Sequence, residues 1–188
     1  MTLMTLSRPF RSVRISRAYR VVRTGVVGLA LALGLGATVW AQLAPDDPDW
    51  KESELPPPPA FDMGKLITFD GAANSSLVYG VDPASIRISG SDNLIRYVLV
   101  ATSASGAKNV MYEAIRCSTG EFKTYARYTS DGRWSPVGDA GWRSMFVSSP
   151  SRHALYFAKA GACDNAATPS SVSAVVFRLK NPNLKYAQ

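Results

Sequence analysis

The segment LIRYVLVATS at residues 94–103 decides the fold of this chain. It is apolar on both of its alternating faces, and that pattern predicts a central β-strand covered on each side. The segments VMYEAIRC at 110–117 and EFKTYARYT at 121–129 follow it after short turns. Strands joined by such short loops favour an antiparallel meander.

Shorter β-like segments extend the sheet on both sides. Residues 66–70, 77–81 and 86–88 precede the central strand, and a turn at 130–132 leads into residues 133–134. Segment 121–129 alternates with a period of two, which predicts a half-exposed strand. The alternation predicts one face with Phe122, Thr124, Ala126 and Tyr128 and the other with Glu121, Lys123, Tyr125 and Arg127.

One helix is predicted at residues 149–161. Ser149 is a suitable N-cap, Pro150 suits the first helical position and Gly161 suits the end. Residues 172–179 are rich in β-branched side chains and are predicted to form a strand rather than a helix. The predicted fold class is α+β: residues 61–188 form a single domain, an antiparallel meander sheet with one main helix of the C-terminal half packed on one face.

Residues 1–41 have the layout of a secretory signal peptide. Residues 1–23 carry six arginines and no acidic residue, and residues 24–45 carry no charge. Small residues precede Gln42, so cleavage after Ala41 is predicted, and with it a periplasmic location. Two alternatives stay open: an uncleaved leader that anchors the chain in the inner membrane, and a mitochondrial presequence of similar composition.

The net charge of +7 comes mainly from this leader. Six of the 21 lysines and arginines lie in it, so 15 basic residues stand against 14 acidic residues in the rest of the chain. A nucleic-acid-binding protein needs a basic surface, because neutralising phosphates supplies most of its affinity. No nucleic-acid partner is therefore predicted, and a membrane contact is predicted only if the leader is not cleaved.

Residues 42–60 contain six of the 12 prolines. Such a segment favours extended polyproline conformation, and we interpret it as a tether that leads into the domain. Trp50 is the exception within it, because an aromatic residue in a linker often docks onto the domain that it precedes.

The two cysteines, Cys117 and Cys163, are predicted to form a disulfide, since an exported protein matures in an oxidising compartment. A pair of buried free thiols is the alternative. Together with the single histidine, the cysteines offer too few ligands for a metal site, and neither a metal nor another cofactor is predicted.

The sequence contains no catalytic motif, and no enzymatic activity is predicted. The single histidine, His153, falls in the first turn of the predicted helix, where a surface or half-buried position is expected, and no G-x-S-x-G motif supplies a nucleophilic serine. Glu113 stands inside an apolar strand and is predicted to form a buried ion pair with Arg96 or Arg116. Glycoside hydrolysis by two carboxylates stays open as an alternative, but the sequence does not pair them.

Aromatic and arginine side chains are concentrated in residues 125–143. These residue types are enriched at binding hot spots, and arginine pairs well with carboxylates. We predict a binding surface formed by Tyr125, Arg127, Tyr128, Arg133, Trp134, Trp142 and Arg143. The alternative is that the aromatic side chains cover one edge of the sheet, with the arginines at the rim.

Five segments resemble the cryptic neisserial protein-like family. They are DPDWKE at 47–52, LPPPP at 55–59, VDPASIRIS at 81–89, NLIRYVLVATSASGAKNVMYEAIRC at 93–117 and KTYARYTSDGRW at 123–134. The resemblance implies export to the cell envelope and a single domain. It carries no activity, substrate or catalytic residue over to this chain.

These observations together predict an exported, non-catalytic binding or structural module of the cell envelope. Its expected partner is another envelope protein or an envelope polymer. A hydrolase acting on an envelope polymer and a membrane-anchored assembly factor are the alternatives.

Overall fold

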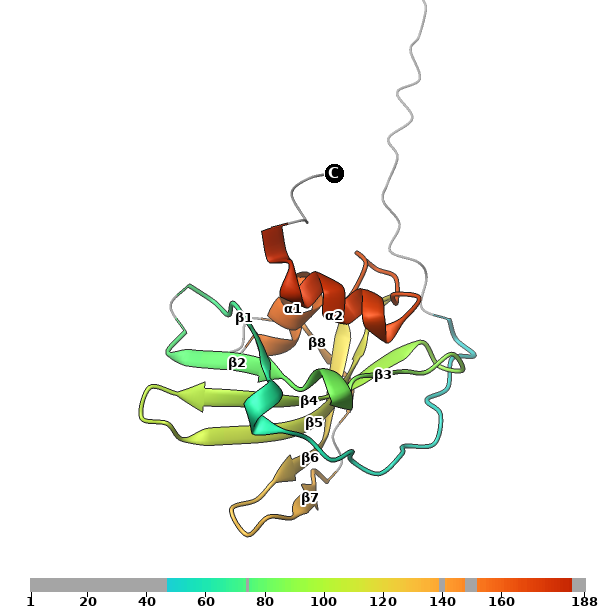
Figure 1. Cartoon of the computed structure of the whole chain (residues 1–188). Coiled ribbons are helices and arrows are strands. Elements are labelled where there is room, and N and C mark those ends of the chain that lie inside the picture. The colour runs from blue at the N-terminus through green and yellow to red at the C-terminus, as the bar shows by residue number, and fades with distance from the viewer. Residues whose placement is uncertain (1–46, 74, 139–140, 148–151, 184–188) are drawn as a thin grey trace, which may run out of the picture. The chain divides into compact units, whose positions relative to one another are not determined.

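The structure, a computed structural model, describes residues 47–73, 75–138, 141–147 and 152–183. Its centre is an antiparallel sheet with the strand order β1-β2-β4-β5-β6-β7, to which β3 and β8 add short pairings with β4 and β6 (Figure 1). The strands are β1 (Ile67–Phe69), β2 (Leu77–Val81), β3 (Arg87–Ile88), β4 (Leu94–Ser103), β5 (Lys108–Arg116), β6 (Glu121–Tyr128), β7 (Trp134–Pro136) and β8 (Arg143–Ser144). The predicted α+β class and antiparallel meander are confirmed.

The central strand β4 is buried on both of its faces, as its sequence predicts. Its first eight residues are all buried. The two hydrophobic clusters of the domain divide its apolar side chains by face: Ile95, Tyr97 and Leu99 on one, and Leu94, Val98 and Val100 on the other. A sheet of this kind needs a cover on each side, because either face left in water would expose a large apolar area.

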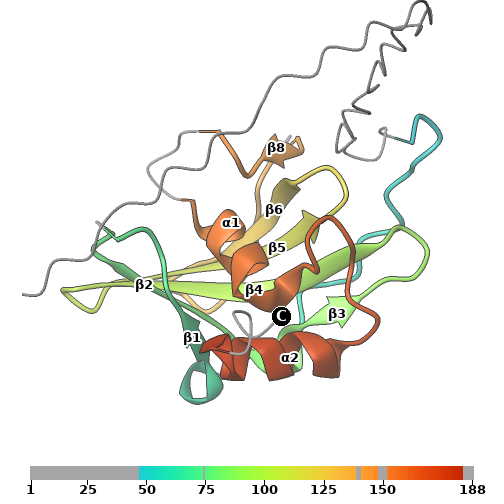
Figure 2. The same cartoon turned by 90° about the horizontal axis from the view of Figure 1, so that it is seen from above.

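Helices form the first cover, and they lie together on one side of the sheet (Figure 2). They are α1 (His153–Phe157), the π-helical turn η3 (Ala158–Ala162) and α2 (Val172–Lys180). α1 and η3 correspond to the helix predicted at 149–161, although Ser149 and Pro150 lie outside the described residues.

The prediction of a strand at residues 172–179 is wrong, because these residues form α2. Ser171 caps the helix by accepting a hydrogen bond from the backbone N–H of Ala174, at 3.2 Å. Val172, Val175, Val176 and Leu179 follow the helical spacing and face the core. Burial of this stripe and the N-cap together outweigh the weak β preference of the valines.

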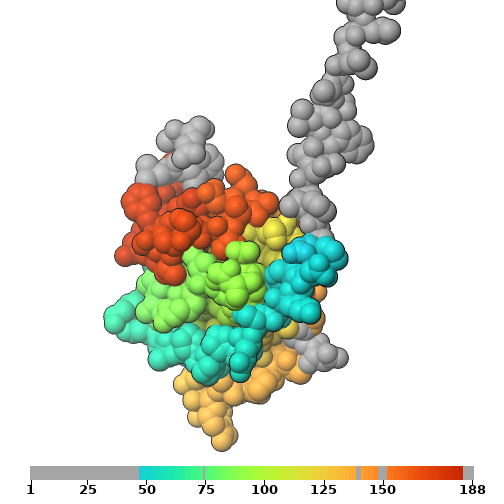
Figure 3. All heavy atoms as spheres, turned by 90° about the vertical axis from the view of Figure 1, so that its right-hand side faces the viewer, coloured from blue at the N-terminus to red at the C-terminus, as the bar shows by residue number. Residues whose placement is uncertain are grey.

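The second cover of the sheet is the extended segment that precedes β1. Trp50, Phe61 and Leu66 pack against the face that carries Leu94, Val98 and Val100. In the space-filling view this segment forms a continuous band across the surface (Figure 3). Residues 47–60 are therefore part of the domain and not a free tether. Among the described residues, no helix is both long and apolar enough to cross a membrane, and the leader at 1–41 lies outside them.

A β-bulge at Tyr125 changes which side chains of β6 share a face. Glu113 of β5 pairs with Thr124, but its neighbour Tyr112 pairs with Ala126, so Tyr125 is the extra residue. The strict alternation predicted for this strand is therefore wrong from Ala126 onward, because Ala126 and Tyr128 lie on the side of Tyr125. Phe122 and Thr124 lie on the helix side, whereas Tyr125 and Ala126 belong to the cluster under the extended segment.

The predicted disulfide is present between Cys117, just after β5, and Cys163, just after η3. Their Cα atoms are 5.7 Å apart and 46 positions apart in sequence. The bond ties the end of the helical layer to the end of a central strand, so it closes a long loop in the unfolded chain.

Replacing both cysteines by serine is expected to lower the free energy of unfolding by about 4 kcal/mol, because a loop of this length loses its entropic constraint. Urea unfolding of the oxidised wild type and of the Cys117→Ser/Cys163→Ser variant measures the difference. Added reductant should lower the urea midpoint of the wild type and leave that of the variant unchanged. Equal midpoints for the two proteins without reductant would contradict the expectation.

Candidate functional site

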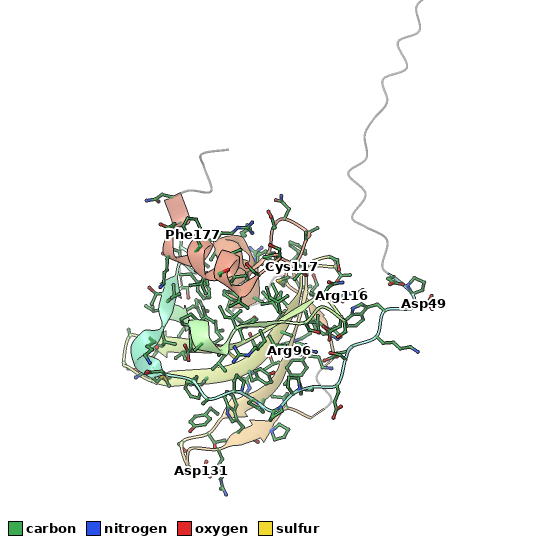
Figure 4. The ribbon with its side chains drawn as sticks, turned by 45° about the vertical axis from the view of Figure 1, so that its right-hand side comes forward. Asp49, Arg96, Arg116, Cys117, Asp131 and Phe177 are labelled. Carbon is green, nitrogen blue, oxygen red and sulfur yellow. A yellow bond between two sulfur atoms is a disulfide. The ribbon has the colours of Figure 1, made fainter. Side chains whose placement is uncertain are left out.

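Trp50 is the first anchor of the extended segment, which we call the strap (residues 47–62). Its indole Nε1 donates a hydrogen bond to the backbone carbonyl of Asp92, at 2.9 Å. The guanidinium carbon of Arg116 lies 3.9 Å from the centre of the indole ring, a cation–π contact. Trp142 meets the same ring edge-on, with centroids 5.7 Å apart. Figure 4 shows Arg116 on the side of the molecule where Asp49 of the strap lies.

Glu52 is the second anchor, and three side chains of the domain bind its carboxylate. Tyr125 donates its hydroxyl at 2.6 Å, Lys123 its ammonium at 2.9 Å and Trp142 its indole N–H at 3.2 Å. Burial raises the pKa of Glu52, but these three donors outweigh it and hold the pKa below its usual range. Burial together with Glu52 raises the pKa of Tyr125, so its hydroxyl stays protonated as a donor. Lys123 and Tyr125 share this face as the alternation predicts, and the bulge adds Ala126 and Tyr128 to the same face.

Ser53 joins the strap to a buried ion pair between Asp92 and Arg96. Arg96 Nη2 lies 2.7 Å from Asp92 Oδ2, and both side chains are almost fully buried. The same carboxylate accepts the backbone N–H of Ser53 at 3.0 Å and its hydroxyl. Burial raises the pKa of Asp92, but Arg96 and Ser53 lower it by more and keep the carboxylate ionised. The strap therefore adds two hydrogen bonds to the Asp92 carboxylate and one acceptor, the Ser53 hydroxyl, for Arg96.

The aromatic residues of the predicted binding surface lie under the strap. Tyr125 is buried, and Trp142 is half-buried between Trp50 and Glu52. Tyr128 and Trp134 pack against the strap's Phe61, with ring centroids 5.1 and 5.8 Å away. The residue types that favour binding are thus used to hold a segment of the same chain.

The arginines of that predicted surface lie elsewhere. Arg127 donates to the side-chain oxygen of Asn109 at 3.2 Å, and Arg133 pairs with its neighbour Asp131. Arg143 lies against Phe122 and donates to Thr124 at 3.2 Å, on the helix side of the sheet. The seven residues therefore do not lie together on one open surface. The strap is bound by Arg96, Arg116, Lys123, Tyr125 and Trp142, which we call the strap site.

Glu113 is buried, but its expected partner is wrong. It accepts from Thr124 at 2.7 Å and from Tyr97 at 3.2 Å, and His153 Nε2 lies 2.8 Å from its Oε2. Burial raises the pKa of Glu113, but His153, Thr124 and Tyr97 outweigh it and lower the pKa below its usual range. His153 is 6% exposed, against the predicted surface or half-buried position. Its ring packs between Tyr79 and Phe122, so this carboxylate–histidine pair is sealed inside the core.

A cleft of about 620 Å³ opens between η3, α2 and the loop after β8. Its floor includes the disulfide, Met145 and Leu155, and its mouth carries Phe146 and Phe177, which are 61% and 57% exposed. Figure 4 shows Phe177 on α2 and Cys117 below the helices. The polar residues of its lining include Lys159, Asp164, Asn165, Arg178 and Asn181.

Two glycines with positive φ give the cleft its form. A Cβ atom at Gly120 (φ 66°) would stand 2.2 Å from the ring of Phe146, and one at Gly161 (φ 130°) would stand 2.4 Å from Cβ of Arg178. Both positions favour glycine for their backbone conformation as well. Sequence reasoning used Gly161 only as a helix end and did not find the cleft, whose residues come from four separate segments.

The family model of the CNP1-like family matches residues 45–180. The chain belongs to the CNP1-like family. The match begins just before the strap and ends with α2, so it spans the strap site, the buried Glu113 pair and the cleft. No curated protein and no solved structure matches the chain.

The buried Glu113 predicts acid sensitivity. Because its pKa is lower in the folded state, its contribution to stability is complete above the unfolded pKa of about 4.3 and is lost as pH falls through the folded value. Glu113→Gln is expected to lower the free energy of unfolding at pH 7 by about 3 kcal/mol, because His153 loses its buried partner. It should also flatten the dependence of the urea midpoint on pH below about 4.3.

Glu54→Gln is the matched control, because Glu54 is an exposed carboxylate of the strap. Its urea midpoints should follow those of the wild type from pH 7 downward. An acid profile of Glu113→Gln as steep as that of the wild type would show that other carboxylates carry the effect.

Proposed function

We propose that this CNP1-like protein is an exported, non-catalytic binding protein of the cell envelope, and that its ligand occupies the cleft beside the disulfide. The observation that carries the proposal is the cleft itself, with two large aromatic side chains exposed at its mouth. Its volume of about 620 Å³ is in the range of small-molecule sites. Contiguous exposed apolar surface rimmed by polar residues is typical of binding grooves.

The lining favours a small amphipathic ligand with a negatively charged group. Apolar side chains and the disulfide form the floor and the mouth, which suits an acyl chain or a ring system. The charged groups of the lining are Lys159, Arg178 and Asp164, which leave an excess of one positive charge. Arg178 Nη2 lies 2.8 Å from Asp164 Oδ2, so the pair is preformed at the rim.

A binding role is favoured over the hydrolase alternative by the distribution of carboxylates. Hydrolysis by two carboxylates needs a facing pair next to the bond that breaks. Among the described residues that line the cleft, Asp164 is the one carboxylate. Glu113, which lies in β5, is fully buried and bonded by three side chains.

The anionic amphipathic dye 1-anilinonaphthalene-8-sulfonate tests the proposal. We expect saturable binding to the folded protein, seen as a rise in fluorescence, and competition by a medium-chain fatty acid. Phe146→Ala/Phe177→Ala should weaken binding about tenfold, because two apolar contact surfaces of the mouth are lost.

Val78→Ala is the matched control, because Val78 is 58% exposed on β2 and does not line the cleft. It should bind the dye as the wild type does. Equal dye affinity in the wild type, the control and the double variant would overturn the assignment of the cleft. Urea unfolding shows in each case that the variant remains folded.

A further inference from the structure

The first part of the strap is held by three side chains and one backbone N–H, and not by strand pairing. We call residues 47–54 the arm. Its bonds to the rest of the domain come from Trp50, Glu52 and Ser53. The arm carries four acidic residues and one lysine, and the strap site beneath it presents Arg96, Arg116 and Lys123. The contacts of the arm therefore resemble those of an acidic peptide that binds a receptor through one aromatic anchor.

The arm and the rest of the strap are anchored independently. Phe61 packs between Tyr128 and Trp134, and the backbone N–H of Asp62 donates to Asp82 Oδ2 at 2.9 Å. Residues 56–59 are four prolines, which have no backbone N–H to donate, and none of the described hydrogen bonds involves residues 54–61. The arm is thus a part of the domain with its own anchors, and the polyproline connection between it and Phe61 is semi-rigid.

We propose that the strap site also accepts the arm of a second copy of this chain, so that two copies exchange arms and form a dimer. The second copy is the partner because it carries the sequence that completes the site: an indole for Arg116 and Asp92, a carboxylate for Lys123 and Tyr125, and a serine for Asp92. Exchange preserves each of these contacts. The balance between the two forms then depends on protein concentration and on the connection, as in domain swapping.

The length of the polyproline connection sets this balance. A short connection holds the arm near its own site at an effective concentration of about 1 mM, so exchange in the wild type should rise as the protein concentration approaches that range. Removing Pro57 and Pro58 shortens an extended polyproline segment by about 6 Å, so the arm reaches its own site less readily. The shortened chain should therefore place its arm on a second copy at lower concentration.

Two measurements on the full mature chain test the exchange. Native mass spectrometry of mixed ¹⁴N and ¹⁵N wild-type chains should detect mixed dimers whose fraction increases with concentration. In light-scattering chromatography, the chain lacking Pro57 and Pro58 should be dimeric at concentrations where the wild type is monomeric. Trp50→Ala in the shortened chain should return it to monomer, whereas Lys51→Ala, which changes an exposed residue of the arm, should not.

A folded shortened chain that stays monomeric would overturn the proposal, as would wild-type chains that form no mixed dimer up to their solubility limit. A dimer that survives Trp50→Ala would also overturn it, because the contact would then lie elsewhere. If the shortened chain fails to fold, a second measurement tests the proposal. A labelled peptide of residues 47–55 is added to the Trp50→Ala/Glu52→Gln protein, and its binding is measured. Saturable binding that is lost on Lys123→Ala in the protein supports the strap site, and absence of binding to the folded protein overturns it.

Discussion

The burial of β4 and β5 on both faces is the constraint on which the rest of this structure depends. A strand that is apolar on alternate sides stabilises the sheet only when both sides are removed from water, so two separate covers are needed. The helices supply one cover, and the disulfide from Cys117 to Cys163 holds them in place. The strap supplies the other, and because proline-rich chain forms no strand ladder, it is held by Trp50, Glu52 and Phe61 instead.

Local sequence patterns predicted the elements that depend on residues close together in the chain. The strands at 94–103, 110–117 and 121–129 follow from alternation and short turns, and the cysteine pair follows from cysteine count and compartment. Residues 172–179 show where composition fails to predict the element. Their valine content favours a strand, but the spacing of Val172, Val175, Val176 and Leu179 after Ser171 favours a helix. The helical period and the cap should have been given more weight than composition. The bulge at Tyr125 had no local indication, since it depends on the pairing of two strands.

The candidate sites depended on contacts that no window of sequence contains. Glu113 and His153 are 40 positions apart, so no local window of sequence pairs them, and a histidine expected near the surface is not an obvious partner for a buried carboxylate. Aromatic residues at 125–143 contact the strap of the same chain, and composition alone does not distinguish such a segment from a foreign partner. Trp50 gave the better indication, because a lone tryptophan in a proline-rich stretch needs an apolar surface nearby.

The strap site and the cleft lie on opposite sides of one strand end, and this arrangement makes them independent. Arg116 faces Trp50 of the strap, while the next residue, Cys117, belongs to the floor of the cleft. Coupling between the two sites would require an element with two arrangements, and each site would have to favour one of the two over the other. The bond to Cys163 fixes Cys117 against η3 whether or not the arm is in place. Departure of the arm would change the surroundings of Arg116 and leave the disulfide at the floor of the cleft intact, so we expect the proposed ligand binding and the proposed arm exchange to be independent.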